Sequence, residues 1–378
     1  MSRSFRKGTD LPLLAVTLLL VVCGLAMILS ASAAVGELSK GDGLTFVKKQ
    51  ALFAGLGIAV MAFTSVFPLE HWRAWSRPTM MLSGLMLLAL HVPGVGVTIY
   101  GSTRWLKLGP VVWQPSEVAK LALILFVADV LARYPRDRWT FRDYRDVLLP
   151  VACALLLILV QPDLGTTLAA TLSVFLMFWC NGTSVARMGS FAACGAAGVL
   201  MLPVVMPYQR DRWTALLDPW SDPKGIGFQI IQSLLAIGSG GIFGLGYGQG
   251  KQKLFYLPIQ YADFIFAVIA EELGLMGSLG LVLLFAIFGY RGLVIARNSM
   301  NPFHQLLAIG VTTLIVGQAF TNIGVVTACL PTTGIPLPFV SHGGTSLLIT
   351  MFSVGVLLNI SRRNNLALRL AGSPEQEA

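Results

Sequence analysis

Three carboxylates stand in an otherwise apolar stretch of the second half of the chain. Asp263 precedes the run Phe-Ile-Phe, and Glu271 and Glu272 follow two turns later. A carboxylate at membrane depth is unfavourable, so each needs a partner or a function. Asp263 can serve as a general base if a substrate hydroxyl reaches it. It can equally cap the helix predicted to begin there, because an aspartate oxygen accepts hydrogen bonds from free N–H groups of a first turn.

Basic residues that could bind an anion lie in two segments between apolar runs. Arg104, Lys107 and Lys120 belong to the first, and Arg210 and Arg212 belong to a later one. Charge-assisted hydrogen bonds to phosphate are among the strongest polar contacts a protein can make. These five residues are therefore candidates to neutralise an anionic substrate.

Other polar and aromatic residues near these segments allow two interpretations each. Glu117 is either part of the binding site or an i,i+3 partner of Lys120 on one helix face. Trp105 can contact a bound substrate or anchor the chain at the membrane surface, where aromatic residues gather. Ser341 and His342 precede a Gly-Gly pair, where the histidine can titrate as a base or pack in a turn.

The composition is that of a polytopic membrane protein. Hydrophobic residues make up 55% of the 378, charged residues 12%, and the mean hydropathy is +0.73. These values exclude an ordinary soluble domain. The five cysteines are scattered without a CxxC pair, which argues against disulfides or a metal site. The net charge of +9 is interpreted first as a signal of membrane topology, and no nucleic-acid partner is expected.

Ten apolar segments are long enough, or nearly so, to span a bilayer, which predicts an all-α fold of ten transmembrane helices. They cover residues 11–34, 46–67, 78–92, 115–132, 147–160, 164–181, 188–206, 263–290, 303–328 and 338–360. No linker divides them, so residues 1–378 are expected to form a single membrane domain.

The distribution of lysine and arginine predicts the orientation. Placing the N-terminus inside puts most of the 27 basic residues on the cytoplasmic side, including the cluster at 133–145. Residues 1–10 and 361–378 are then cytoplasmic tails, and 207–262 is a long outer loop between helices 7 and 8. Within that loop, 224–237 has the pattern of an amphipathic helix. The glycine run 239–250 is predicted to be a flexible turn, since no Walker motif accompanies it.

Several separate motifs resemble the SEDS family of membrane glycosyltransferases, across essentially the whole chain. The motifs are Ser30-Ala31-Ser32, Arg104-Trp105-Leu106, Gln114-Pro115-Ser116-Glu117 through Lys120, Gln161 through Thr166, Gln229 through Ser233, Asp263 through Phe266, Glu271 through Gly274 and Pro338 through Gly344. The resemblance implies the ten-helix SEDS fold in the bacterial cytoplasmic (inner) membrane. It also implies polymerisation of lipid II into peptidoglycan glycan strands at the outer face, with inversion at the sugar carbon.

Within this resemblance, Asp263 corresponds to the family's catalytic aspartate and is expected to be the general base. Arg104, Lys107, Lys120, Arg210 and Arg212 are expected to contact the undecaprenyl pyrophosphate. A divalent cation, Mg²⁺ or Mn²⁺, could bridge the phosphates, although no ligand cluster in the sequence requires one. The expected partners are a class B penicillin-binding protein (a transpeptidase), other divisome proteins and membrane lipids.

The motifs at 218–223, 232–234 and 252–254 favour the division branch, FtsW, whereas Ile335 through Pro338 leans towards the elongation branch, RodA. A division role would place the protein at the septum. The chain departs from the family pattern at 257–262, where Leu-Pro-Ile-Gln-Tyr-Ala replaces Leu-Pro-Glu-x-His-Thr, and at His342, where tyrosine is usual.

Two other functions stay open on the residues alone. A lipid II flippase or a proton-coupled transporter would use Glu117, Glu271 and Glu272 as relay groups. A scaffold without activity would only recruit the transpeptidase. The position of Asp263 near the outer surface favours the enzyme, because carriers usually bind their substrates at the midplane.

Overall fold

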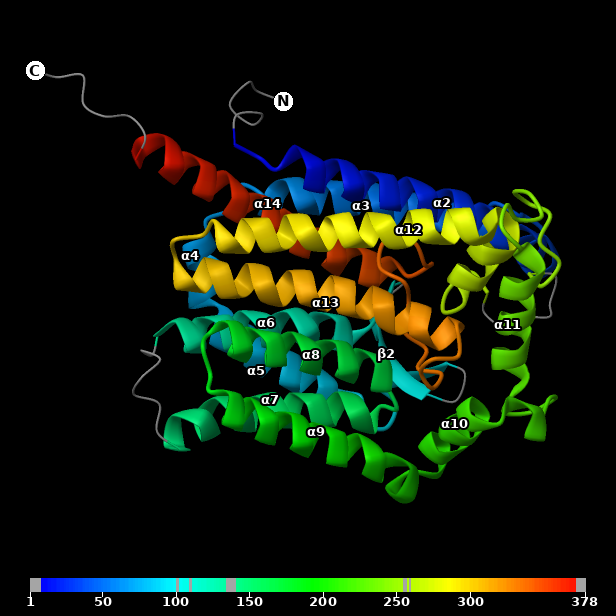
Figure 1. The fold of residues 1–378 in the computed structure, drawn as a ribbon, viewed down its shortest axis with the longest axis horizontal. Coiled ribbons are helices and arrows are strands. Elements are labelled where there is room, and N and C mark those ends of the chain that lie inside the picture. Colours follow the sequence, from blue (N-terminus) through cyan, green and yellow to red (C-terminus); the bar gives the residue numbers. More distant parts are fainter. Residues whose placement is uncertain are drawn as a thin grey trace, which may run out of the picture.

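Long helices running side by side dominate the computed structural model (Figure 1). It describes residues 8–99, 102–108, 111–133, 141–253, 257 and 260–371. The start of α2 (Leu11–Lys40) and the end of α14 (Gly344–Ala371) lie at one end of the bundle (Figure 1). The centre of the predicted basic loop, 134–140, and the outermost parts of both predicted tails lie outside the described residues.

Each of the ten predicted segments coincides with a helix. Besides α2 and α14 these are α3 (Thr45–Thr64), α5 (Ser76–Ala89), α6 (Pro115–Arg133), α7 (Phe141–Val160), α8 (Leu164–Cys180), α9 (Val185–Val205), α12 (Ile265–Arg297) and α13 (Pro302–Val326). In the described part of the chain, six helices, α2, α3, α9, α12, α13 and α14, are long and apolar enough to cross a membrane. The polytopic helical fold is confirmed, while the crossing of all ten stays a prediction. Helix α14 also continues to Ala371, past the predicted start of the C-terminal tail at 361.

Side-chain caps define where several of these helices begin. Asp10 accepts a hydrogen bond from the N–H of Leu13 at 2.9 Å, and Asp163 accepts one from Thr166 at 3.1 Å. Asn301 does the same for Phe303 at the start of α13. Such caps satisfy N–H groups that have no partner inside the helix.

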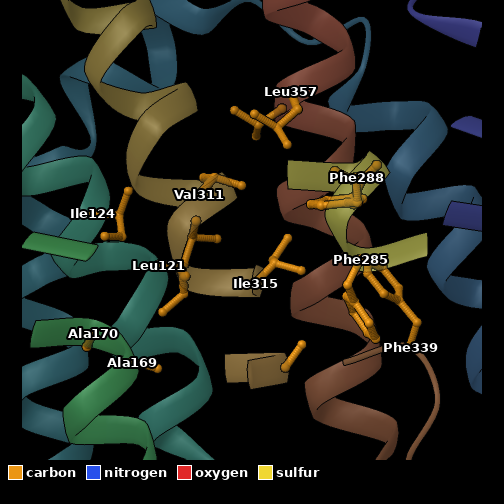
Figure 2. Close-up of a cluster of buried hydrophobic side chains, with 14 of the residues drawn as sticks. Leu121, Ile124, Ala169, Ala170, Phe285, Phe288, Val311, Ile315, Phe339 and Leu357 are labelled. Atoms are coloured by element: carbon orange, nitrogen blue, oxygen red, sulfur yellow. The ribbon is translucent and has the colours of Figure 1, made fainter. Parts of the chain in front are cut away.

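Helix α13 forms the centre of the core. In the most apolar 18-residue stretch of α13, 78% is buried. The same share is buried in α14, whereas only 11% is buried in the peripheral α9. Val311 and Ile315 of α13 lie between the side chains of α6 on one side and those of α12 and α14 on the other (Figure 2). A helix enclosed in this way can hold polar side chains in fixed positions, since close packing leaves them little freedom.

A small antiparallel sheet follows α5, and the sequence patterns did not predict it. Its strands are β1 (Gly96–Ile99), β2 (Ser102–Leu108) and β3 (Val111–Trp113), in the order β1-β2-β3. Side chains alternate along β2, so that Arg104 and Leu106 are buried whereas Lys107 is exposed. Three strands interrupted by glycines are too short for their alternation to stand out among the surrounding apolar residues.

The predicted outer loop 207–262 contains more structure than expected. It begins with α10 (Pro207–Leu217), followed by a 3-10 turn, η2 (Pro219–Ser221), and α11 (Phe228–Gly240). Helix α11 confirms the predicted amphipathic helix, displaced by a few residues. Helices α10 and α11 and strand β2 lie at the end of the bundle opposite to the end of α14 (Figure 1).

Helix α12 is interrupted at Gly274, whose φ of 66° and ψ of −165° are not helical. We call residues 241–253, which run alongside this break, the glycine loop. The carbonyls of Glu271 and Glu272 accept hydrogen bonds from N–H groups of the glycine loop, both at 3.0 Å. The N–H groups of Leu275 and Met276 donate to carbonyls of the same loop at 2.9 and 3.1 Å. The backbone groups released by the break are therefore satisfied, as a membrane interior requires.

The side chains of both glutamates bind the same loop. The Glu271 carboxylate accepts the backbone N–H of Lys251 at 2.7 Å. The Glu272 carboxylate accepts the Lys253 ammonium at 2.6 Å and the Ser30 hydroxyl at 2.7 Å. Both glutamates are buried and fully engaged in these contacts. Their arrangement is that of structural anchors rather than of a proton relay.

The glycine run therefore serves close approach, not only flexibility. A β-carbon on Gly244 would lie 2.2 Å from the carbonyl oxygen of Glu272, and its φ is +79°. Gly248 has a similar φ of +81°, but nothing lies within 4 Å of its β-carbon position. The two glycines share a backbone conformation and differ in the space around them.

Gly244→Ala is expected to destabilise the protein much more than Gly248→Ala. The left-handed conformation costs an alanine about 1–2 kcal/mol at either position, but only at 244 does the methyl group overlap the backbone of α12. Thermal melting of both variants in detergent micelles measures the difference. Equal melting temperatures would show that the glycine loop does not pack against α12 as described.

Candidate active site

A cavity of about 520 Å³ opens at the end of the bundle that carries β2 and α10. Five of the predicted site residues line it, namely Arg104, Trp105, Arg212, Asp263 and His342. They come from β2, α10, the segment before α12 and the segment before α14. Residues far apart in the sequence thus meet in one cavity.

Asp263 lies just before α12 and does not cap it. The cap position is Phe264, and no side chain makes a capping hydrogen bond there. Within the described part of the chain, the Asp263 carboxylate has no hydrogen-bond or ion-pair partner, whereas its backbone carbonyl accepts the Asn322 amide at 2.7 Å. The capping interpretation is therefore wrong, and the carboxylate faces the cavity without a partner among the described residues.

Two arginines surround this carboxylate. Arg104 Nη1 and Asp263 Oδ2 each lie 3.6 Å from the position that a β-carbon on Gly334 would occupy. Burial raises the pKa of Asp263 to about 6, while Arg104 and Arg212 act in the opposite direction and Asp163 raises it further. A carboxylate with a pKa near 6 is mostly ionised at neutral pH and basic enough to accept a proton.

Arg104 is held by backbone carbonyls of the turn between α7 and α8. Its Nε donates to the carbonyl of Gln161 at 2.8 Å, and its Nη2 donates to that of Pro162. A guanidinium carries five N–H donors, so donors remain for a ligand. The alternation of β2 turns this side chain inward while Lys107 turns outward.

Arg212 is fixed in a similar way on α10. Its guanidinium donates to the carbonyl of Thr332 and to the hydroxyl of Tyr208, and it lies 4.3 Å from the centre of the Tyr208 ring. Tyr208 and Arg212 are four residues apart and therefore share one face of the helix. Two anchored guanidiniums beside a carboxylate that pairs with none of the described residues suit a reaction in which an anion forms and a proton is removed.

His342 lies in the cavity wall between two aromatic rings. Its ring centre is 5.5 Å from that of Phe46 and 5.8 Å from that of Tyr261. Burial lowers the pKa of His342 to about 4, and Lys49 lowers it further. The neutral imidazole packs in the turn and is a weaker base than Asp263.

The remaining predicted residues do not line this cavity. Lys107 and Arg210 are exposed, on β2 and α10 respectively. Ser341 is buried, and its hydroxyl donates to the carbonyl of Ala262 at 2.5 Å. It connects the segments before α14 and α12, so its contacts are structural.

Glu117 and Lys120 form the i,i+3 ion pair, with 2.9 Å between Nζ and Oε1. Both are buried in the bundle, and Lys120 Nζ also donates to Gln318 Oε1 at 2.6 Å. Neither residue lines the cavity. Their partners are thus protein groups, not a ligand.

The cavity also contains residues that the sequence did not single out. Lys49, Gln114, Tyr208, Gln229 and Gly334 all contribute to its wall. The i,i+4 spacing of Tyr208 and Arg212 was the available signal for Tyr208, but it required α10 to be recognised as a helix. Lys49 stands at the start of an apolar segment, where a lysine is ordinary.

No group of three His, Cys, Asp or Glu side chains that could hold a metal ion occurs among the residues the structure describes. A magnesium ion bound with a pyrophosphate substrate would usually keep several waters and take its other ligands from the phosphates and one or two carboxylates.

Comparison with known proteins gives consistent results. A family model for FtsW, RodA and SpoVE, described as "Cell cycle protein", matches residues 11–366. Stage V sporulation protein E of Bacillus subtilis (strain 168) is 42% identical over 94% of this chain and 98% of its own length. A probable peptidoglycan glycosyltransferase FtsW of Geobacter metallireducens is 39% identical over 94% of this chain and 95% of its own length.

Solved structures have the same fold. A chain from a structure described as "Structural coordination of polymerization and crosslinking by a peptidoglycan synthase complex" superposes with a TM-score of 0.77 at 30% identity, covering 94% of this chain and 98% of that one. The rod shape determining protein RodA of Thermus thermophilus gives 0.70 at 26% identity, with 94% and 97% covered. The resemblance drawn from the motifs is confirmed, and this chain belongs to the FtsW/RodA/SpoVE family of membrane proteins, the SEDS family.

Proposed function

We propose that the protein is a peptidoglycan glycosyltransferase that polymerises lipid II at the outer face of the cytoplasmic membrane, with Asp263 as general base. The relatives named as probable peptidoglycan glycosyltransferases support the reaction class. The observation that carries the assignment of roles is the Asp263 carboxylate, which has no partner among the described residues and lies beside two anchored arginines.

In the proposed reaction, a sugar hydroxyl of the acceptor lipid II gives its proton to the Asp263 carboxylate. Its oxygen attacks the anomeric carbon of the donor, and the bond from that carbon to the phosphate oxygen breaks. The pyrophosphate leaves with the electron pair and is stabilised by Arg104 and Arg212. Donors fixed before the reaction are effective here because they need no reorganisation as charge develops.

The flippase and transporter alternatives lose their main support. Glu117, Glu271 and Glu272, the carboxylates suited to a relay, all bind partners within the protein. A relay group must exchange protons readily, whereas hydrogen bonds from backbone N–H groups or an ammonium favour the charged form of a carboxylate.

We further propose a role in septal wall synthesis together with a class B transpeptidase. The solved complex that superposes with a TM-score of 0.77 is described as coordinating polymerisation and crosslinking, which supports a transpeptidase partner. Relatives bear both FtsW and sporulation names, so the family alone does not choose the branch. The FtsW-like motifs at 218–223, 232–234 and 252–254 favour division.

Asp263→Asn should abolish polymer formation while leaving the protein folded. An amide cannot accept the proton, and loss of a general base removes roughly a 100- to 10,000-fold rate enhancement. For the parent protein, kcat/KM should be constant above pH 6 and fall about tenfold per pH unit below it, since Asp263 with a pKa of about 6 becomes protonated there. The measurement is gel separation of products from labelled lipid II. The control is Asp211→Asn, an exposed position on α10. Normal polymer from Asp263→Asn would refute the base assignment.

Arg212→Ala should lower kcat/KM, whereas Arg210→Ala should not. A hydrogen bond to a charged group contributes about 1.5–3 kcal/mol, which corresponds to roughly 10- to 150-fold in rate. The two arginines lie two residues apart on α10, but only Arg212 lines the cavity. The same assay measures both variants. Equal losses would mean that general surface charge, not the cavity, attracts the substrate.

Affinity purification from growing cells should recover a transpeptidase of the division type. A shared complex couples glycan synthesis to crosslinking and requires both proteins at one place. Mass spectrometry of the purified complex identifies the partner. Recovery of only an elongation or sporulation partner would assign the protein to that branch instead.

A further inference from the structure

Two amide side chains of α13 hold the last outer segment of the chain against Asp263. We propose that Asn322 and Gln318 are positioning residues, which fix the spacing between Asp263 and the two arginines through residues 332–336. This inference rests on the proposed function for its kinetic consequences, but not for its structural ones.

Asn322 joins two segments through a single amino group. Its Nδ2 donates to the carbonyl of Asp263 at 2.7 Å and to the carbonyl of Ile335 at 2.8 Å. The side chain is 1% exposed, so water does not compete for these bonds. Since both partners are acceptors, only a group with two N–H donors can make both contacts.

Gln318 lies one helical turn earlier on the same face of α13. Its Nε2 donates to the carbonyl of Pro336 at 2.9 Å, next to the carbonyl bound by Asn322. Its Oε1 accepts the Lys120 ammonium, which the Glu117 carboxylate neutralises. The buried ion pair of α6 therefore orients Gln318, which gives Glu117 and Lys120 a role that needs no contact with substrate.

Residues 332–336 lie beside Asp263 and the two arginines. The carbonyl of Thr332 accepts the guanidinium of Arg212. The β-carbon position of Gly334 lies 3.6 Å from both Arg104 Nη1 and Asp263 Oδ2, and its φ is +68°. A shift of this segment would thus move Arg212 and open the space between Arg104 and Asp263.

Such a shift should affect the chemical step more than binding. Displacing a catalytic group by about an ångström can reduce a rate roughly 100-fold. Arg104 keeps its own anchors on Gln161 and Pro162, so attraction of an anionic substrate would persist. Arg104 and Arg212 lower the pKa of Asp263. A larger distance between Asp263 and these arginines would therefore raise that pKa.

The test compares Asn322→Leu with Thr321→Val. Thr321 is a buried neighbour on α13 whose hydroxyl bonds to the carbonyl of Gly317 within its own helix. Both changes remove a buried polar group from α13, but only the first releases residues 332–336. Asn322→Leu is expected to lower kcat about 100-fold with KM changed less than about threefold, and to move the acid limb of kcat/KM above pH 6.

Hydrogen–deuterium exchange of residues 330–337 gives a readout that does not depend on activity. Faster exchange in Asn322→Leu, with parental exchange in Thr321→Val, is the expected result. Parental exchange in Asn322→Leu, or an equal kinetic loss in Thr321→Val, would overturn the proposal. If Asn322→Leu does not insert into the membrane, Gln318→Met serves as the second variant with the same expectations.

The two proposals fail in different ways. A wild-type protein that makes no polymer from lipid II refutes the glycosyltransferase function. Faster exchange in Asn322→Leu would still support the positioning role in that case. Polymer formation by the wild type with unchanged exchange in the variant would refute the positioning role alone.

Discussion

The hydrogen bonds between the glycine loop and the interrupted helix α12 are the constraint on which the end of the molecule with α10 and α11 depends. A helix break in a membrane protein releases backbone N–H and carbonyl groups that nothing in the lipid can satisfy. Here Gly274 makes the break, and residues 241–246 supply the missing partners. Because Glu271 and Glu272 then bind residues 248–253 as well, the loop is fixed along the first turns of α12. The loop and the two parts of α12 thereby hold each other in place on both sides of the break.

Opposing influences set the basicity of the candidate catalytic carboxylate. Burial and the nearby Asp163 raise the pKa of Asp263, and Arg104 and Arg212 lower it. Had either arginine formed a direct ion pair with Asp263, the carboxylate would be a poor base. Both guanidiniums instead take backbone carbonyls as partners, Gln161 for one and Thr332 for the other. The positive charges are close enough to attract an anion without occupying the carboxylate.

Local patterns in the sequence predicted the ten long apolar helices and the position of Asp263 just before one of them. They could not predict contacts between distant segments. The apolar runs located all ten long helices, because hydrophobic length is a local property. Lys107 and Arg104 look equivalent in sequence, and only the alternation of a strand that was not recognised separates them. Arg210 and Arg212 also look equivalent in sequence. Both lie on α10, a helix that the sequence patterns did not reveal, and only Arg212 lines the cavity. The pairing of Glu117 with Lys120 followed from spacing, whereas their link to Gln318 required the packing of α6 against α13.

The contact between Ser30 and Glu272 has a consequence for how the protein is made. The two residues are 242 positions apart, yet they share a buried site with the ammonium of Lys253. Ser30 leaves the ribosome early, and its partners Lys253 and Glu272 follow only after most of the chain has been translated. The first helix consequently has to stay accessible until the glycine loop and α12 can pack against it. This buried site can therefore form only after α12 has been made, long after the first helix.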